Sequence, residues 1–165
     1  MKTTMLRRCF QRIKGLPAFL KIGILAAATA LVLNSFVFQV SLVRGKSMEP
    51  LVMENAVVIG LRPAPALFGI ARGDVVIFKK KSVFEGELIK QVVGLPGDGV
   101  EIKDHILYCS GKEVLRDDSL ADLPYCIVPE NSYFVLGVNL PGSSDSRHWE
   151  DRFVRLDEIE SKVIM

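Results

Sequence analysis

Two side chains of this sequence have the types needed to act together as a nucleophile and its general base. Ser47 lies in the stretch RGKSMEPLV, and Lys90 lies in GELIKQVVGLPGD. A serine hydroxyl becomes a nucleophile when a nearby base takes its proton, and a neutral lysine amine can serve as that base. The pKa of a free lysine is near 10.4, so a lysine that acts as a base near neutral pH needs a pKa several units lower.

Whether Lys90 meets this requirement depends on where its strand lies. Alternate residues of a strand share a face, which places Lys90 between Leu88 and Val92. Burial among such apolar neighbours would lower the pKa of the ammonium group. A lysine at a sheet edge would instead extend its charged end to water, and the strand pattern alone favours this edge position. The pattern leaves both positions open.

The two histidines offer a rival base. His148 follows the tripeptide DSR, and His105 falls in a predicted turn. A Ser-His-Asp triad could be assembled from Ser47, His148 and an aspartate, although no local spacing favours it. With two histidines and no CxxC pair, the sequence predicts neither a metal site nor a cofactor.

A membrane-spanning helix is predicted directly before the serine. Residues 22–43 contain no Asp, Glu, Lys, Arg or His, and a helix of this length covers roughly 33 Å, enough for a hydrocarbon core of about 30 Å. Residues 1–21 carry six basic and no acidic side chains, whereas the remainder carries 21 − 6 = 15 basic and 19 acidic ones. The positive-inside rule therefore predicts a single-pass plasma-membrane protein, with residues 1–21 as a cytoplasmic tail and residues 44–165 outside.

A cleaved signal peptide is the alternative to an uncleaved anchor. The small residues Ala26–Ala28 lie inside the apolar run rather than after it, and the run is long for the apolar region of a signal peptide. We therefore expect an uncleaved anchor. The basic tail is expected to lie against the anionic bilayer surface, and no nucleic-acid partner is expected.

The residues after the anchor predict a mainly β domain. Short segments rich in Val, Ile, Phe and Tyr alternate with turns that contain Gly, Pro, Asp or Asn. Tight turns are predicted near Lys103–His105 and at Ser110–Gly111. We therefore expect a compact antiparallel sheet or barrel-like domain over residues 44–165. Residues 62–73, RPAPALFGIARG, are expected to form a loop that rests either on the bilayer or on its own domain.

The cysteines fall on both sides of the predicted membrane. Cys9 lies on the cytoplasmic side and is expected to be a free thiol. Cys109 and Cys126 lie on the outer side, where a disulfide between them would contribute roughly 3 kcal/mol. Their spacing leaves the bonded and the free states equally open.

Four blocks of the sequence occur in the order typical of one enzyme family. They are GKSMEPL, RGDVVIFK at residues 72–79, KQVVGLPGD at residues 90–98 and GVNLPGSSDSRHW at residues 137–149. With these blocks behind one anchor, the chain resembles the type I signal peptidases, the membrane-anchored Ser-Lys peptidases that include conjugative-transfer maturation peptidases. The resemblance runs from the membrane segment nearly to the C-terminus.

The resemblance implies roles for individual residues. Ser47 matches the nucleophile and Lys90 the general base. Ser143 matches a serine whose hydroxyl orients the base, and Asp145 and Arg147 match a structural acid–base pair near the site.

The turn around the nucleophile shows both a match and a departure. Met48 and Pro50 match residues that shape the turn presenting the serine, and the N–H of Ser47 is expected to donate to the oxyanion. Gly45 stands where some family members have a serine that adds a second oxyanion donor. If the match holds, this chain must use a backbone group or water there.

Other departures raise the question of specialisation. Gln91 replaces a common arginine, Glu150 replaces a usual glycine, and Val138, Leu140 and Pro141 replace polar residues of the last block. The resemblance implies preprotein substrates with a small-x-small segment docked as an added β-strand. The alternatives are a conjugation-type peptidase that matures a propilin, and a non-catalytic anchored domain that binds a partner. Since Ser47 and Lys90 are both retained, the non-catalytic alternative is disfavoured.

Overall fold

The computed structural model describes residues 17–62 and 64–164. The chain divides into two compact units, Met1–Val37 and Phe38–Met165, which are described separately. Most of the predicted cytoplasmic tail, including Cys9, lies outside the described residues.

The first unit contains one described helix, α2, over Ala18–Val37. Within the described part of the chain, no helix combines the length and the apolar character needed to cross a membrane. The helix also differs from the predicted segment of residues 22–43, because it begins earlier and ends at Val37. Phe38–Leu42 instead form strand β1, whose pairing with strand β2, Val57–Leu61, supplies the backbone hydrogen bonds that a longer helix would have made.

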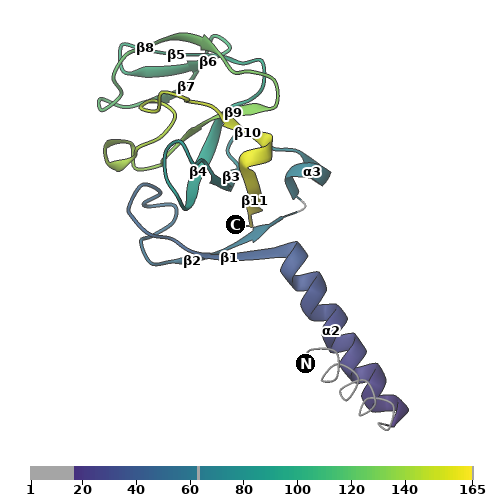
Figure 1. Cartoon of the computed structure of the whole chain (residues 1–165). Coiled ribbons are helices and arrows are strands. Elements are labelled where there is room, and N and C mark those ends of the chain that lie inside the picture. The colour runs from purple at the N-terminus through teal and green to yellow at the C-terminus, as the bar shows by residue number, and fades with distance from the viewer. Residues whose placement is uncertain (1–16, 63, 165) are drawn as a thin grey trace. The chain divides into compact units, whose positions relative to one another are not determined.

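The second unit is built from two antiparallel sheets (Figure 1). The larger sheet has the strand order β1-β2-β11-β3-β4-β9-β10, and the smaller has the order β7-β6-β5-β8. The bounds of the remaining strands are β2 Val57–Leu61, β3 Val75–Lys79, β4 Glu87–Gly94, β5 Gly99–Lys103, β6 Ile106–Cys109, β7 Lys112–Arg116, β8 Leu123–Ile127, β9 Ser132–Leu136, β10 Val154–Arg155 and β11 Ile159–Val163. The prediction of a mainly β, antiparallel domain is confirmed.

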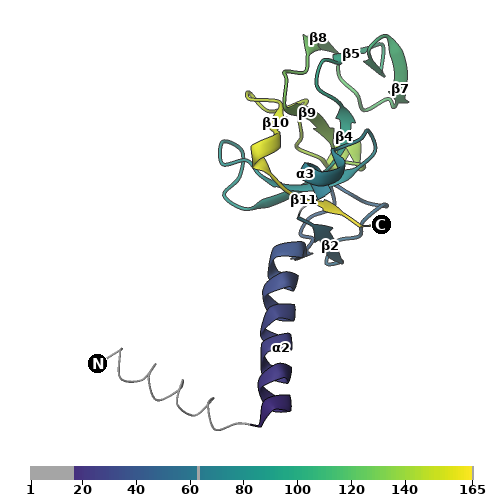
Figure 2. The same ribbon diagram turned by 90° about the vertical axis from the view of Figure 1, so that its right-hand side faces the viewer.

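The smaller sheet is made by two tight hairpins, and Figure 2 shows it beyond the ends of β4 and β9. The turn between β5 and β6 is Asp104–His105, and the turn between β6 and β7 is Ser110–Gly111. All four residues have positive φ, the conformation that two-residue hairpin turns with the right twist require. Both predicted turns are therefore confirmed.

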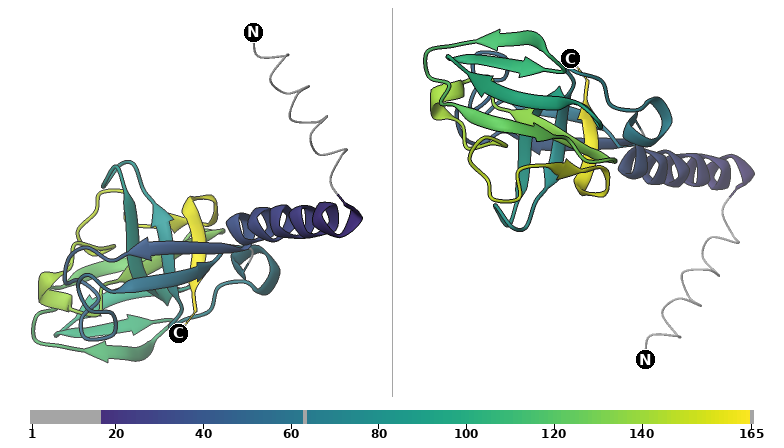
Figure 3. Two further views of the ribbon diagram at one scale, coloured as in Figure 1. Left: turned by 90° about the horizontal axis from the view of Figure 1, so that it is seen from below. Right: turned by 90° about the horizontal axis from the view of Figure 1, so that it is seen from above.

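The larger sheet curls, so that its first strand β1 comes to face the beginning of β4 (Figure 3). Strand β3 is buried from Val75 to Phe78 and pairs with β4 along its length. Strand β9, in contrast, pairs with β4 only from Gln91 onward. Within the described residues, the segment Glu87–Lys90 therefore has one unpaired edge, and β1 also has one because it pairs only with β2.

The proline-broken segment of residues 62–73 contains a short helix, α3 Ala64–Phe68, where a loop was predicted. Ala64 and Pro65 are buried, and α3 contacts β11. Leu67 and Phe68 are exposed. The segment therefore rests on its own domain through one end of α3.

Of the two states that the sequence left open, the structure shows the free one, since Cys109 and Cys126 are both free. Cys109 on β6 and Cys126 on β8 pair with the same residue, Val100 of β5, from opposite sides. Two strand spacings separate them, roughly 10 Å, whereas a disulfide needs Cα atoms less than about 7 Å apart.

Candidate active site

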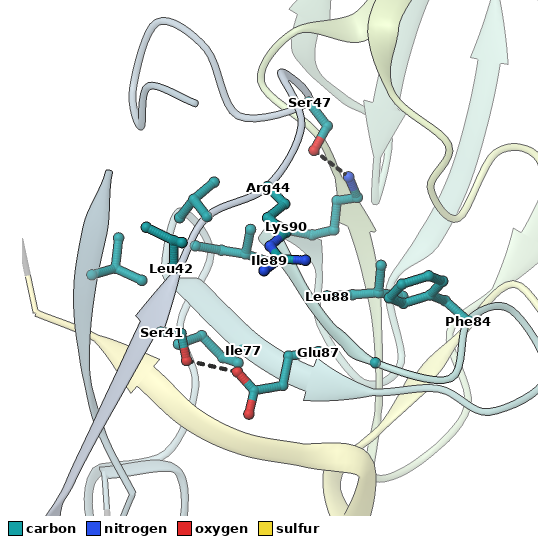
Figure 4. Close-up of a pocket in the computed structure, with 13 residues that line it drawn as sticks. Ser41, Leu42, Arg44, Ser47, Ile77, Phe84, Glu87, Leu88, Ile89 and Lys90 are labelled. Carbon is teal, nitrogen blue, oxygen red and sulfur yellow. Dashed lines mark hydrogen bonds between the residues drawn. The ribbon is translucent and has the colours of Figure 1, made fainter. Parts of the chain in front are cut away.

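Ser47 and Lys90 meet in the structure although they lie 43 residues apart. Lys90 Nζ lies 2.7 Å from Ser47 Oγ, within hydrogen-bonding distance (Figure 4). Ser47 comes from the loop after β1, and Lys90 comes from the middle of β4. The lysine is 3% exposed, so its side chain is buried and does not extend to water, although its part of β4 has one unpaired edge.

The surroundings of Lys90 favour its neutral form. Burial lowers the pKa of its ammonium group to about 8, because an apolar site solvates the charge poorly. The negative charge of Asp145 acts against this shift, and the positive charge of Arg147 adds to it. Lys90 therefore has the two properties of a general base at mildly alkaline pH, contact with the nucleophile and a lowered pKa.

The loop that carries Ser47 is held in place by the buried residue Met48 and by hydrogen bonds from Asn139 of a neighbouring loop. Met48 is fully buried and accepts a backbone hydrogen bond from Val52 at 2.9 Å, which closes the turn after Ser47. Asn139 donates its backbone N–H to Ser47 O and its side-chain Nδ2 to Lys46 O, both at 3.0 Å. The sequence did not identify Asn139 as a residue of the site, and only its place in the GVNLPGSSDSRHW block could have suggested it.

Pro50 lies at the outer end of this turn. Its peptide bond with Glu49 is cis, and its side chain is exposed. Glu49 Oε1 accepts a long hydrogen bond, 3.4 Å, from the N–H of Glu54.

Asp145 and Arg147 form a buried, two-armed ion pair. The arginine donates from Nε to one carboxylate oxygen at 2.8 Å and from Nη2 to the other at 2.9 Å. The same carboxylate accepts the N–H of Gly137 at 3.0 Å, and Arg147 also donates to Leu140 O at 2.9 Å. The pair thereby fixes the segment that carries Asn139.

The charge of Asp145 is secured by these contacts. Burial of the carboxyl group raises its pKa, but the hydrogen bonds from Arg147 and from Gly137 N–H outweigh burial and hold the pKa below its usual value. Asp145 therefore remains a carboxylate at every pH where Lys90 changes its charge.

Ser143 lies close to Ser47 because both residues pack tightly against the backbone of Gly137. A side chain on Gly137 would meet Ser143 and would lie 2.5 Å from Ser47 O, so only glycine fits there. Ser143 is 6% exposed, and among the described residues its hydroxyl meets no partner at hydrogen-bonding geometry, although it lies close enough to Asp145 to help lower the pKa of that carboxyl group. Such a buried hydroxyl is free to bond to a group that moves during the reaction.

Among the described residues, neither histidine forms a hydrogen bond with Ser47. His105 is in the β5–β6 turn, where its Nδ1 lies 2.9 Å from Leu120 O. The side chain of His148 is 54% exposed, and its Nδ1 lies 3.7 Å from Asp145 Oδ1. Lys90, and neither histidine, is the titratable side chain that the structure places in hydrogen-bonding distance of Ser47 Oγ.

A cavity of about 580 Å³ opens beside the Ser47–Lys90 pair. We name it the cleft: Ser41–Arg44 line one side, Phe84 and Gly86–Lys90 line the other, and Val58 and Ile77 lie between them. Figure 4 shows Ser47 and Lys90 at one end of the cleft and Ser41 and Glu87 at the other. The two unpaired strand edges described above border this space.

The family model described as "Signal peptidase, peptidase S26" matches residues 16–165. A signal peptidase I of Bacillus licheniformis is 34% identical over 146 residues, which cover 79% of this chain and 77% of that protein. A signal peptidase I of Bacillus caldolyticus is 33% identical over 156 residues and covers 84% of each chain. A crystal structure of a signal peptidase I from Enterococcus faecalis is 29% identical, with a TM-score of 0.49 over 58% of this chain and 97% of that one. The family match, which spans nearly the whole chain, shows that this chain belongs to the S26 signal peptidase family.

Proposed function

We propose that this chain is a serine endopeptidase that removes signal peptides from exported proteins, with Ser47 as nucleophile and Lys90 as general base. Membership of the S26 family supports the reaction and the substrate class. The single observation that carries the assignment of residues is the 2.7 Å contact between Ser47 Oγ and the buried Nζ of Lys90. A non-catalytic binding domain would have no use for a buried lysine with a lowered pKa.

In the first half of the reaction, neutral Lys90 takes the proton of Ser47 Oγ as the oxygen attacks the scissile carbonyl carbon. The resulting ammonium then donates that proton to the leaving amine, and an ester to Ser47 remains. In the second half, Lys90 takes a proton from water, the hydroxide attacks the ester, and Ser47 recovers its proton. The N–H of Ser47 is the oxyanion donor in this scheme, because Gly45 has no hydroxyl to contribute.

Two neighbours support Lys90 in this scheme. The carboxylate of Asp145 stabilises the ammonium form, which arises each time Lys90 holds a proton. The unbonded hydroxyl of Ser143 is the candidate to orient the amine. Arg147 acts indirectly, since its ion pair keeps the carboxylate of Asp145 charged and in place.

The cleft supports recognition of an extended substrate. A peptide strand placed between β1 and Glu87–Lys90 would find unpaired backbone groups on both sides and bring its scissile bond to Ser47. Val58, Ile77 and Ile89 line the middle of the cleft, which suits small apolar side chains near the cleaved bond.

The cleavage site is proposed to lie just outside a membrane. The apolar residues before Phe38 would anchor the chain, residues 1–21 would form the cytoplasmic tail, and the unit from Phe38 onward would be extracytoplasmic. The six basic residues before residue 22 support this topology through the positive-inside rule. Ser47 follows the end of α2 by ten residues, which suits a substrate cut close to its own membrane segment.

Specialisation for a propilin gains no support from Val138 and Leu140, two of the departures in the last block. Leu140 is buried with Phe134 and Leu136, and Val138 packs against the cluster that contains Met48. These side chains fill the interior and do not line the cleft. Their apolar character therefore says nothing about the substrate.

The test is cleavage of a membrane-inserted signal-peptide substrate by the wild type and by Ser47→Ala, Lys90→Ala, Lys90→Arg and His148→Ala, each checked for folding. We expect the wild type and His148→Ala to cut after a small-x-small site. Ser47→Ala lacks the nucleophile and Lys90→Ala lacks the base, so both should be inactive. Lys90→Arg should also be inactive, because arginine does not deprotonate. Cleavage by Lys90→Arg together with loss of activity in His148→Ala would overturn the assignment of the base. A wild type that cuts no signal peptide would overturn the function.

A further inference from the structure

Trp149 is a buried aromatic residue to which the proposed reaction gives no role. It is the single tryptophan of the chain, it closes the GVNLPGSSDSRHW block, and it is 6% exposed. Its indole Nε1 donates a hydrogen bond of 3.1 Å to Ser144 Oγ. Ser144 stands between Ser143 and Asp145, the two neighbours that support Lys90. Trp149 therefore contacts the segment that carries both partners of the base.

The side chains of this segment point in two directions. Ser143 has an extended backbone, with φ −112° and ψ 127°, so the side chains of Ser143 and Ser144 lie on opposite sides of the chain. Ser143 and Asp145 are buried, whereas Ser144 is exposed. Trp149 therefore holds the segment by its middle side chain, which points away from the side that Ser143 occupies.

The ring of Trp149 packs on the sheet face from which Lys90 projects. On β3, Val76 lies opposite Lys90 and Phe78 lies opposite Leu88, and such cross-strand pairs share a face of the sheet. The Trp149 ring meets Phe78 edge to face, with ring centroids 6.1 Å apart, and belongs to the same buried cluster as Val76. One side chain therefore spans from the sheet face of the base to the segment with its partners.

The chain beyond Trp149 is fastened to the end of the same strand. Lys80 follows β3 and is fully buried, and its Nζ donates to Asp151 Oδ2 at 2.6 Å and to Phe153 O at 2.9 Å. Glu158 lies 3.5 Å from the same ammonium group, so the buried charge is paired. The backbone of Trp149 is therefore held beside β3 independently of the hydrogen bond that its indole makes.

We propose that Trp149 is a positioning residue for the general base: it fixes the separation between the sheet face that carries Lys90 and the segment that carries Ser143 and Asp145. The proposal rests on the proposed function, since it concerns the base of the same reaction. A rigid two-ring side chain keeps this separation constant, and its hydrogen bond to Ser144 prevents the segment from moving away. Without that bond, Asp145 lies farther from the ammonium group, and the Ser143 hydroxyl orients the amine less well.

The test compares the wild type with Ser144→Ala, Trp149→Phe and the double variant, as full-length proteins in detergent micelles with one signal-peptide substrate. Ser144→Ala removes the acceptor and Trp149→Phe removes the N–H, so each breaks the same hydrogen bond. At pH 9, above the pKa of Lys90 of about 8, each single variant should lower kcat about fivefold. The double variant should lower it no further than Trp149→Phe does. KM should not change, because neither residue lines the cleft.

The pH profile separates positioning from simple packing. Burial is the main cause of the lowered pKa of Lys90; the charge of Asp145 raises this pKa, and the smaller effect of Arg147 lowers it. A segment that has moved away should therefore shift the midpoint of kcat/KM in Ser144→Ala below the wild-type value near 8. A purely structural role would lower the stability and leave this midpoint unchanged.

Tyr133→Phe is the matched control, because Tyr133 is another buried aromatic residue of the same cluster. Among the described residues it forms no hydrogen bond with Ser144, so kcat and the midpoint should match the wild type. Ser144 is exposed, so Ser144→Ala tests the inference even if Trp149→Phe does not fold. If Ser144→Ala keeps the wild-type kcat and midpoint, or if the two substitutions act additively, Trp149 only fills the core and the inference is wrong. A wild type that cuts no signal peptide would contradict the proposed function instead.

Discussion

The burial of Lys90 makes a quantitative prediction about the dependence of activity on pH. Only the neutral amine can take the proton of Ser47, so activity should follow the neutral fraction of Lys90. With a pKa of about 8, roughly one molecule in ten has neutral Lys90 at pH 7. With the ordinary lysine pKa of 10.5, the neutral fraction would be lower by a factor of about 300, the antilogarithm of 10.5 − 8 = 2.5.

The expected profile of kcat/KM therefore rises about tenfold per pH unit at acidic and neutral pH, bends near pH 8 and is flat above about pH 9. The assay uses an acetylated peptide without His, Cys or other groups that titrate in this range, so that the profile reports the free enzyme. His148→Ala is the control variant. Its exposed ring lies 3.7 Å from Asp145 and does not contact Ser47, so the midpoint should stay near 8.

Two results would refute the reasoning. A midpoint near 6.5 that disappears in His148→Ala would identify a histidine base. A profile that still rises tenfold per unit at pH 9 would show that Lys90 keeps an ordinary pKa, and that the apolar surroundings do not act on it as the structure indicates.

Three further predictions concern stability and positioning. Lys90→Met should raise the free energy of unfolding at pH 7 by up to about 3 kcal/mol in urea titrations. The folded-state pKa lies below the unfolded value, so the cost of the buried charge is full below pH 8 and vanishes as the pH rises to about 10.5; a gain that persists at pH 11 would contradict this origin. Asn139→Ala removes the side-chain hydrogen bond to Lys46 O and should lower kcat several-fold with little change in KM. An unchanged kcat would show that the loop carrying Ser47 keeps its conformation without this hydrogen bond. Arg147→Ala leaves the carboxylate of Asp145 buried and unpaired, which should cost about 3–5 kcal/mol by thermal unfolding; a loss below about 1 kcal/mol would mean that water reaches the carboxylate.

Local patterns in the sequence were enough to predict the strands and turns of the second unit. The turns at Asp104–His105 and Ser110–Gly111 follow from residues that tolerate positive φ between two apolar runs. The boundary at Val37 was missed, because Phe38–Leu42 contain no charged residue and were counted with the apolar run, although Gln39 and Ser41 alternate with apolar residues as in a strand. The free state of Cys109 and Cys126 depends likewise on register, which no spacing of cysteines reveals.

By itself the sequence determined which chemistry was available: Ser47 and Lys90 in the family's four blocks, with Asp145 and Arg147 in the last of them. Only the tertiary structure decided that Lys90 is buried against Ser47, that Asn139 holds the nucleophile loop and that Glu87 faces Ser41 across the cleft. The physical reason is that residue type and periodicity act over a few positions. Burial, pKa and contact are set by which strands pair and how the sheet curls, and these bring together residues 43, 46 and 93 positions apart.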